Sequence, residues 1–135
     1  TGAQAAIALE SAARAHGPVA PESDAWRVTA DGTLDLLPLL VRLADETDAA
    51  RGAARFHATL AAAFADWLAA AAEARNVRTV ALGGGCFHNR LLSATLVEHL
   101  AASGVVVLRP ERLPPGDAGI AAGQAWVAQR ILEGN

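Results

Sequence analysis

Three consecutive glycines, Gly83-Gly84-Gly85, are the first feature of the sequence that could do chemistry. They follow a short apolar run and precede a segment of helix-forming residues that begins at Asn89. Glycines have no Cβ atom and let the backbone approach a ligand closely, while the free N–H groups at a helix start attract an anion. The pattern predicts a turn that binds a nucleotide phosphate, although a purely structural turn is equally compatible with it.

Asp117 is the second feature, because it stands where a proline-rich loop gives way to a predicted helix. Its carboxylate could cap that helix or bind a divalent metal ion. Gly119 and Gly123 are four residues apart, hence on one helical face, and would let that face approach a ligand or another backbone closely. From the residues alone both roles of Asp117 stay open.

The histidines and the cysteine form no recognisable catalytic set. His16, His57, His88 and His99 contain no pair at the i, i+4 spacing of a helical metal site. Only His88, beside the glycines, is a candidate for ligand contact; we predict that His57 packs in the interior and that His99 lies at the edge of the solvent. Cys86, the single cysteine, is predicted to be a small buried residue and not a nucleophile.

The elements that must position these residues alternate between strands and helices. We predict, in order, strand 79–82, the glycine loop, helix 89–102, strand 105–108, a proline-rich loop and helix 117–132. This order is typical of an α/β architecture with a parallel pair of strands. If the two strands are neighbours, Gly83–Gly85 and Asp117 lie at the same edge of the sheet, because loops after adjacent parallel strands converge there.

The first half of the chain is predicted to be mostly helical, with helices at 3–15, 36–44 and 50–75 and a hairpin at 26–35 whose two-residue turn is Asp31-Gly32. Bulky side chains recur at three- and four-residue steps along the longest helix. They predict one apolar stripe that forms either core or a subdomain interface, made of Phe56, Leu60, Phe64, Trp67, Leu68 and Ala71.

Composition excludes several classes of protein. The formal net charge is −3 with acidic and basic residues interspersed, so no basic patch predicts nucleic-acid binding. No uncharged apolar run is long enough to span a membrane. Every basic residue other than histidine is Arg, which excludes a Walker-type phosphate loop. A single cysteine fits a reducing cytoplasm, and the lack of any Met predicts that the chain is part of a longer protein.

Both glycine-containing segments resemble the C-terminal signature of the HypF-like carbamoyltransferase family of hydrogenase maturation. The matching residues are Gly84, Gly85, Phe87, Asn89, Arg90, Leu91, Leu92, Pro114, Pro115, Asp117, Gly119, Ile120, Gly123, Gln124 and Ala125. Weaker matches are Gln4-Ala5-Ala6 and Arg55-Phe56-His57. The resemblance spans essentially the whole chain, but the two C-terminal motifs carry its specificity.

The resemblance implies an α/β fold that forms the C-terminal half of an actin-like ATPase (ribonuclease H-like) fold, with a short sheet covered by helices. Residues 1–135 would be a single C-terminal subdomain of a larger cytoplasmic carbamoyltransferase, without an internal linker. Such an enzyme makes carbamoyl-adenylate from carbamoyl phosphate and ATP and passes the carbamoyl group to a cysteine thiolate of a partner protein. The implied partners are therefore the N-terminal half of the same protein and a carbamoyl-acceptor protein, with neither nucleic acid nor membrane.

Carried over residue by residue, the resemblance assigns nucleotide binding to Gly83, Gly84, Gly85 and Asn89. It assigns Asp117 to a divalent metal ion (magnesium, zinc or iron), shared with histidines that this chain does not contain. Possible further ligand contacts are His88 and Gly119. Because those histidines are missing, we predict that the isolated chain has no transferase activity.

The sequence also departs from the family pattern. His88 replaces a usual Gln, Gly116 replaces a usual Asn, and Thr1-Gly2-Ala3 stands where the family tends to have Tyr-Glu-Gly. Three alternatives therefore remain open: a non-catalytic domain that binds nucleotide or docks a partner, an O-carbamoyltransferase of the same superfamily, and a small-molecule kinase with the actin-like fold.

Overall fold

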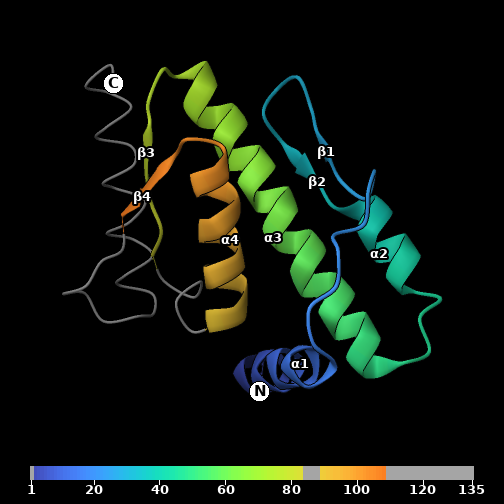
Figure 1. Ribbon diagram of the computed structural model, residues 1–135. Coiled ribbons are helices and arrows are strands. Elements are labelled where there is room, and N and C mark those ends of the chain that lie inside the picture. The colour runs from blue at the N-terminus through green and yellow to red at the C-terminus, as the bar shows by residue number, and fades with distance from the viewer. Residues whose placement is uncertain (1, 84–88, 109–135) are drawn as a thin grey trace. The chain divides into compact units, whose positions relative to one another are not determined.

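The computed structural model describes residues 2–83 and 89–108 and divides the chain into two compact units, Thr1–Trp67 and Leu68–Asn135. We call them the first and the second unit. The elements, in chain order, are α1 (Gly2–His16), β1 (Arg27–Val28), β2 (Leu34–Asp35), α2 (Leu37–Leu43), α3 (Ala49–Ala74), β3 (Thr79–Ala81), α4 (Arg90–Ala102) and β4 (Val106–Leu108) (Figure 1). Each of these elements falls within one or two residues of a predicted one.

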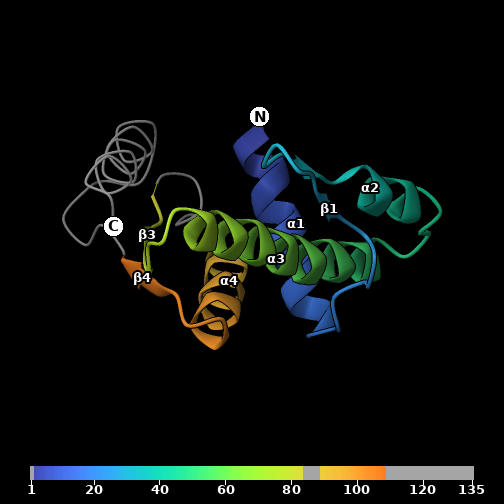
Figure 2. The ribbon, with the colours of Figure 1, turned by 90° about the horizontal axis from the view of Figure 1, so that it is seen from above.

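In the first unit, α1 crosses α3, and the β1–β2 hairpin and α2 lie along another side of α3 (Figure 2). The predicted two-residue turn of the hairpin is wrong. Val28 pairs with Leu34, and the Thr29 N–H donates to the Thr33 carbonyl over 2.9 Å, so three residues form the loop. The reason is Gly32, whose φ of 86° places a left-handed residue at the end of a tight turn, as three-residue hairpin loops require.

The predicted apolar stripe on α3 does not form the core of the described residues, and the alternative of a subdomain interface stays a prediction. Its bulky members are only partly buried, and Trp67 is 36% exposed. The fully buried positions of α3 carry small or polar side chains instead, namely Ala53, Ala54, His57, Thr59, Ala61, Ala63, Ala65 and Ala72. Because alanine is small, neighbouring segments can pack closely on more than one side of the helix. The buried positions are then not marked by a stripe of bulky residues in the sequence.

Two tryptophan side chains link the hairpin region to α3 by hydrogen bonds. Trp26 Nε1 donates to the Asp66 carboxylate over 2.9 Å, and Trp67 Nε1 donates to the Gly32 carbonyl over 2.8 Å. Trp67 therefore lies at the surface of the unit because its polar N–H reaches the hairpin loop.

In the second unit, β3 and β4 form the predicted parallel pair, with Thr79 opposite Val106 and Ala81 opposite Leu108. α4 connects the two strands and packs against β4 (Figures 1 and 2). Its inward side chains Leu92, Leu96 and Leu100 form the core together with Val80, Leu82 and Val105. The predicted α/β class, a short parallel sheet with helices, is confirmed.

α3, which runs from the first unit into the second, and α4 are each followed by a residue in the left-handed conformation. Asn76 adopts a φ of 54° after α3, and Val77 N–H donates back to the Ala72 carbonyl over 2.9 Å. Gly104 adopts a φ of 79° after α4, and Val105 N–H donates to the Leu100 carbonyl over 3.0 Å. Both are Schellman motifs, which satisfy the last helical carbonyl groups. Among the described residues, no helix has the length and apolar character that crossing a membrane would require.

Candidate functional site

The carboxyl edge of the parallel pair is where the sequence predicts the site. The pairing continues one residue beyond β3, since Leu82 N–H donates to the Leu108 carbonyl over 3.0 Å. The chain then leaves β3 at Gly83 and leaves β4 after Leu108, at the same edge of the sheet. The sequence predicts that Gly83–Gly85 and Asp117 share an edge if the two strands are neighbours. β3 and β4 are neighbours, so this condition is met.

The N-terminus of α4 adds peptide N–H donors to this edge, because α4 follows β3 and returns the chain to the start of β4. Asn89 caps the helix: its Oδ1 accepts from the Leu92 N–H over 2.9 Å, and its backbone is extended with φ −93° and ψ 93°. The side chain is half-buried. The structure thus gives Asn89 a capping role, and its contact with a nucleotide stays a prediction.

Arg90 is a residue at this edge to which the sequence assigned no role. It is the first residue of α4, it is exposed, and the first turn contains no acidic side chain. A cation at this position is unfavourable for the helix dipole, which prefers Asp or Glu there. A basic side chain beside a capping Asn, following glycines, is a sequence signal for anion binding that could have been recognised.

The remaining predicted site residues, Gly84, Gly85, His88, Asp117 and Gly119, lie outside the described residues, as does Cys86. Their assignments therefore stay predictions. Within residues 2–83 and 89–108, no group of three or more His, Cys, Asp or Glu side chains gathers where it could hold a metal ion.

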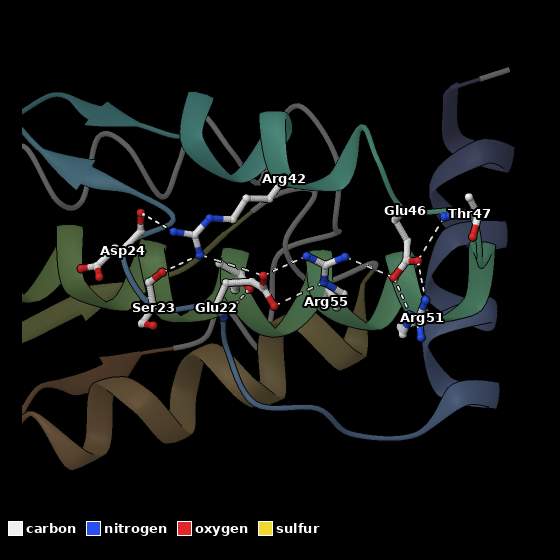
Figure 3. A network of polar contacts seen from close by, with 9 residues as sticks. Glu22, Ser23, Asp24, Arg42, Glu46, Thr47, Arg51 and Arg55 are labelled. Atoms are coloured by element: carbon white, nitrogen blue, oxygen red, sulfur yellow. Dashed lines mark hydrogen bonds and ion pairs between the residues drawn. The ribbon is translucent and has the colours of Figure 1, made fainter.

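A second polar centre lies in the first unit around Arg55, and we call Glu22, Arg42, Glu46, Arg51 and Arg55 the Arg55 cluster (Figure 3). The Arg55 guanidinium donates two hydrogen bonds to the Glu22 carboxylate, over 2.8 and 3.3 Å, and one to Glu46 Oε1 over 3.1 Å. Arg51 donates two hydrogen bonds to the same carboxylate, to Glu46 Oε1 over 2.7 Å and to Oε2 over 2.9 Å.

This geometry holds both carboxylates in the charged form. Hydrogen bonds from Arg51, from the Asp48 backbone and from Arg55 lower the pKa of Glu46 from 4.5 to about 2. The hydrogen bond from Arg55 likewise lowers the pKa of Glu22. A carboxylate with a lowered pKa is a poor general acid or base near neutral pH.

The Arg55 cluster is therefore a clamp. It ties the segment before the hairpin and the loop between α2 and α3 to one turn of α3, and Glu22 N–H donates to Thr59 Oγ1 over 3.0 Å beside it. The sequence singled out neither Glu22 nor Glu46, because partners 33 and 9 positions from Arg55 leave no periodic pattern.

His57 has the packing role that was predicted for it. Its side chain is 3% exposed, Nδ1 donates to the Ala53 carbonyl over 2.9 Å, and its ring meets Phe56 edge-on at 5.7 Å. His99 lies half-buried on α4, in agreement with a position at the solvent edge.

Comparison with known proteins places these features in a family. Residues 2–124 match the family model described as carbamoyltransferase, Kae1-like domain, second subdomain. Carbamoyltransferase HypF2 of Cupriavidus necator is 58% identical over 105 residues, which cover 78% of this chain and 13% of that protein. A carbamoyltransferase HypF homolog of the same organism is 50% identical over 137 residues, covering 95% of this chain and 35% of that protein.

A solved structure gives the same result in three dimensions. The crystal structure of full-length HypF in a phosphate- and nucleotide-bound form matches with a TM-score of 0.74 and 28% identity, over 96% of this chain and 18% of that one. The chain thus spans only a small part of the length of the proteins that it matches.

Proposed function

The chain belongs to the HypF carbamoyltransferase family, and on that premise we propose that it forms the nucleotide-binding part of a carbamoyltransferase active site within a longer polypeptide. The nucleotide would bind at the carboxyl edge of β3 and β4. Gly83, Gly84 and Gly85 would bring the backbone close to its phosphates, and Asn89 would contact it beside the start of α4.

The observation that supports the proposal best is the parallel pairing of β3 with β4. It brings the end of β3, which leads into Gly83, and the end of β4 at Leu108 to one edge, and α4 begins after that edge. Peptide N–H groups converge on an anion at such an edge, which is where ligands of open α/β sheets bind. The similar HypF structure was solved with phosphate and nucleotide bound, which supports the same class of ligand.

In the proposed reaction, the longer cytoplasmic protein hydrolyses carbamoyl phosphate to carbamate and phosphate, and the carbamate then displaces pyrophosphate from ATP to form carbamoyl-adenylate. A partner's cysteine thiolate attacks the carbamoyl carbon and releases AMP. The amide N–H groups at the start of α4 and the Arg90 guanidinium would stabilise the negative charge of the phosphate groups. This part of the chain would bind and orient the nucleotide, while the remaining polypeptide would supply the other reacting groups.

A divalent metal ion, when bound, would polarise the phosphate or carbamoyl group. The described residues do not by themselves form a metal site. On the family resemblance, Asp117 and histidines of the longer polypeptide would supply the donors.

The proposal is tested by titrating the complete polypeptide with ATP, with and without magnesium, and by assaying carbamoyl transfer to a thiol-bearing acceptor. We expect ATP binding and transfer in the unaltered protein, and loss of transfer with weaker metal dependence in Asp117→Ala. ATP binding that is insensitive to metal, without any carbamoyl transfer, would instead indicate a non-catalytic nucleotide-binding domain. Carbamoyl transfer by residues 1–135 alone would contradict the assignment of this chain to one part of the site.

A further inference from the structure

Three polar side chains are buried within residues 2–83 and 89–108, those of His57, Thr59 and Ser93. The fold uses the first two: His57 Nδ1 donates to a carbonyl group of its own helix, and Thr59 Oγ1 accepts from the Glu22 N–H. Ser93 is only 6% exposed, yet no hydrogen bond joins its hydroxyl to any residue that the structure describes. A buried polar group without a partner lowers stability and calls for an explanation.

Two other hydroxyl groups, on α4 and at its C-terminal end, behave differently from that of Ser93. Thr95 Oγ1 donates to the Leu91 carbonyl over 2.9 Å, and Ser103 Oγ donates to the His99 carbonyl over 3.3 Å. The oxygen of Ser93 is nevertheless not sealed off, because no described side-chain oxygen or nitrogen is both fully inaccessible and without a partner. A small polar group can therefore reach the Ser93 hydroxyl.

Ser93 lies in the first turn of α4, four residues after the capping residue Asn89. Side chains at this spacing lie one above the other on the same face of a helix, and their Cα–Cβ bonds tilt toward the helix N-terminus. The Ser93 side chain is therefore directed toward the start of α4, where the Asn89 carboxamide oxygen accepts from the Leu92 N–H. That helix start is the place where we propose that the nucleotide phosphates bind.

Helix stability alone gives no reason for a serine at this position. The other buried side chains of α4 are the aliphatic groups of Leu92, Leu96 and Leu100. Alanine is a better helix former than serine and would bury no polar group here. Residues that break such local preferences are expected at functional sites. A hydroxyl group near an anion-binding helix start has a suitable role there, because it can donate to a charged phosphate oxygen.

We propose that Ser93 is a further ligand-binding residue of the nucleotide site, and that its hydroxyl donates a hydrogen bond to a phosphate oxygen of the bound nucleotide. The inference rests on the proposed function, which brings the phosphates to the start of α4. It explains why a buried hydroxyl of the second unit has no hydrogen bond to the residues that the structure describes.

The test is calorimetric titration of the complete polypeptide with ATP, together with displacement of ATP by adenosine, which has no phosphate group. Ser93→Ala should weaken ATP binding about tenfold and leave adenosine binding unchanged, because a hydrogen bond to a charged phosphate oxygen is lost. The matched control is Thr95→Ala, whose hydroxyl bonds within α4, and it should leave both affinities unchanged.

Unchanged ATP affinity in Ser93→Ala, an equal loss for adenosine, or an equal loss in Thr95→Ala would overturn the inference. Each of these results leaves the proposed function intact as long as the unaltered polypeptide binds ATP. An unaltered polypeptide that does not bind ATP overturns the proposed function, and this inference with it.

Unfolding without nucleotide separates a ligand contact from a structural role of the same hydroxyl. Ser93→Ala should leave the urea midpoint of the second unit unchanged or raise it, because it removes a buried group without a partner and improves helix propensity. Amide hydrogen exchange of α4 in urea measures that midpoint. A lower midpoint in Ser93→Ala would show that the hydroxyl stabilises the fold itself and would contradict the proposal.

Discussion

The two units of the chain differ in the interactions that stabilise each of them. In the second unit, β3, α4 and β4 enclose an aliphatic core in which Leu96 and Leu100 are 1% and 0% exposed. In the first unit, most buried apolar positions carry alanine, and polar contacts also join the segments around α3. Arg55 lies between two carboxylates, and the indole N–H groups of Trp26 and Trp67 link the hairpin region to α3. The unit that carries the proposed site is thus the one with the aliphatic core.

The difference suits the role that we propose for the second unit. A site that holds an anion with peptide N–H groups needs a rigid strand edge and a fixed helix start, and close aliphatic packing provides both.

The largest effect is expected from truncating the aliphatic core. Leu100→Ala should lower the free energy of unfolding of the second unit by about 2–5 kcal/mol, because it removes a buried side chain and leaves a cavity. Amide hydrogen exchange of α4 in urea measures this unit separately. Val106→Ala, at a position that is 56% exposed, is the matched control and should have little effect. Similar costs at the two positions would contradict an aliphatic core centred on α4.

The same contrast explains how much could be predicted from the sequence. Continuous apolar runs, a glycine turn and Gly104 identify the elements of the second unit and their parallel order, because each is a local signal. The ion pairs of Arg55 join residues far apart in the sequence, and no local pattern announces them. The buried positions of α3 leave little sequence signal, because alanines and not Phe64 or Trp67 occupy them.

Removing the centre of the polar clamp should have the next largest effect. Arg55→Leu deletes three hydrogen bonds to carboxylates and leaves Glu22 and Glu46 facing each other, so we expect a loss of about 1–2 kcal/mol after solvent screening. The fluorescence of Trp26 and Trp67, in a Trp126→Phe background, reports unfolding of the first unit. Arg51→Leu, whose side chain is 54% exposed, should cost less. An equal or larger loss for Arg51→Leu would show that Arg55 is not the centre of the clamp.

Helix ends allow a smaller, matched comparison between the units. Gly104 has a φ of 79°, and at this helix end the N–H groups of Gly104 and Val105 donate to two helical carbonyl groups. Gly104→Ala adds a Cβ atom to this left-handed residue and should lower the free energy of unfolding of the second unit by about 1 kcal/mol. Gly17→Ala, at a φ of 94° after α1, disturbs a single backbone hydrogen bond to Ala13 and should cost the first unit less. Urea unfolding measured as above tests both, and the reverse order would contradict the assignment of a more rigid second unit.

The smallest effect is a pH dependence of the stability of the first unit. The folded state lowers the pKa of Glu46 to about 2 from an ordinary 4.5, so its ion pairs stabilise the fold above pH 4.5. That stability is lost progressively as the pH falls from about 5 towards 2. Glu46→Gln should be less stable at pH 7 but should lose less stability on acidification. Tryptophan fluorescence during urea unfolding at several pH values checks this, and an unchanged pH profile would contradict it.

The central claim, that a nucleotide binds at the edge where α4 begins, is tested most directly by titrating ATP into the complete polypeptide and its Asn89 variants by calorimetry. Asn89→Ser and Asn89→Asp both retain a side-chain oxygen that can cap α4, so the fold should persist. We predict that Asn89→Ser weakens ATP binding about tenfold through loss of the amide contact, and that Asn89→Asp weakens it further by placing a negative charge beside the phosphates. Unchanged ATP affinity in both variants would contradict the account.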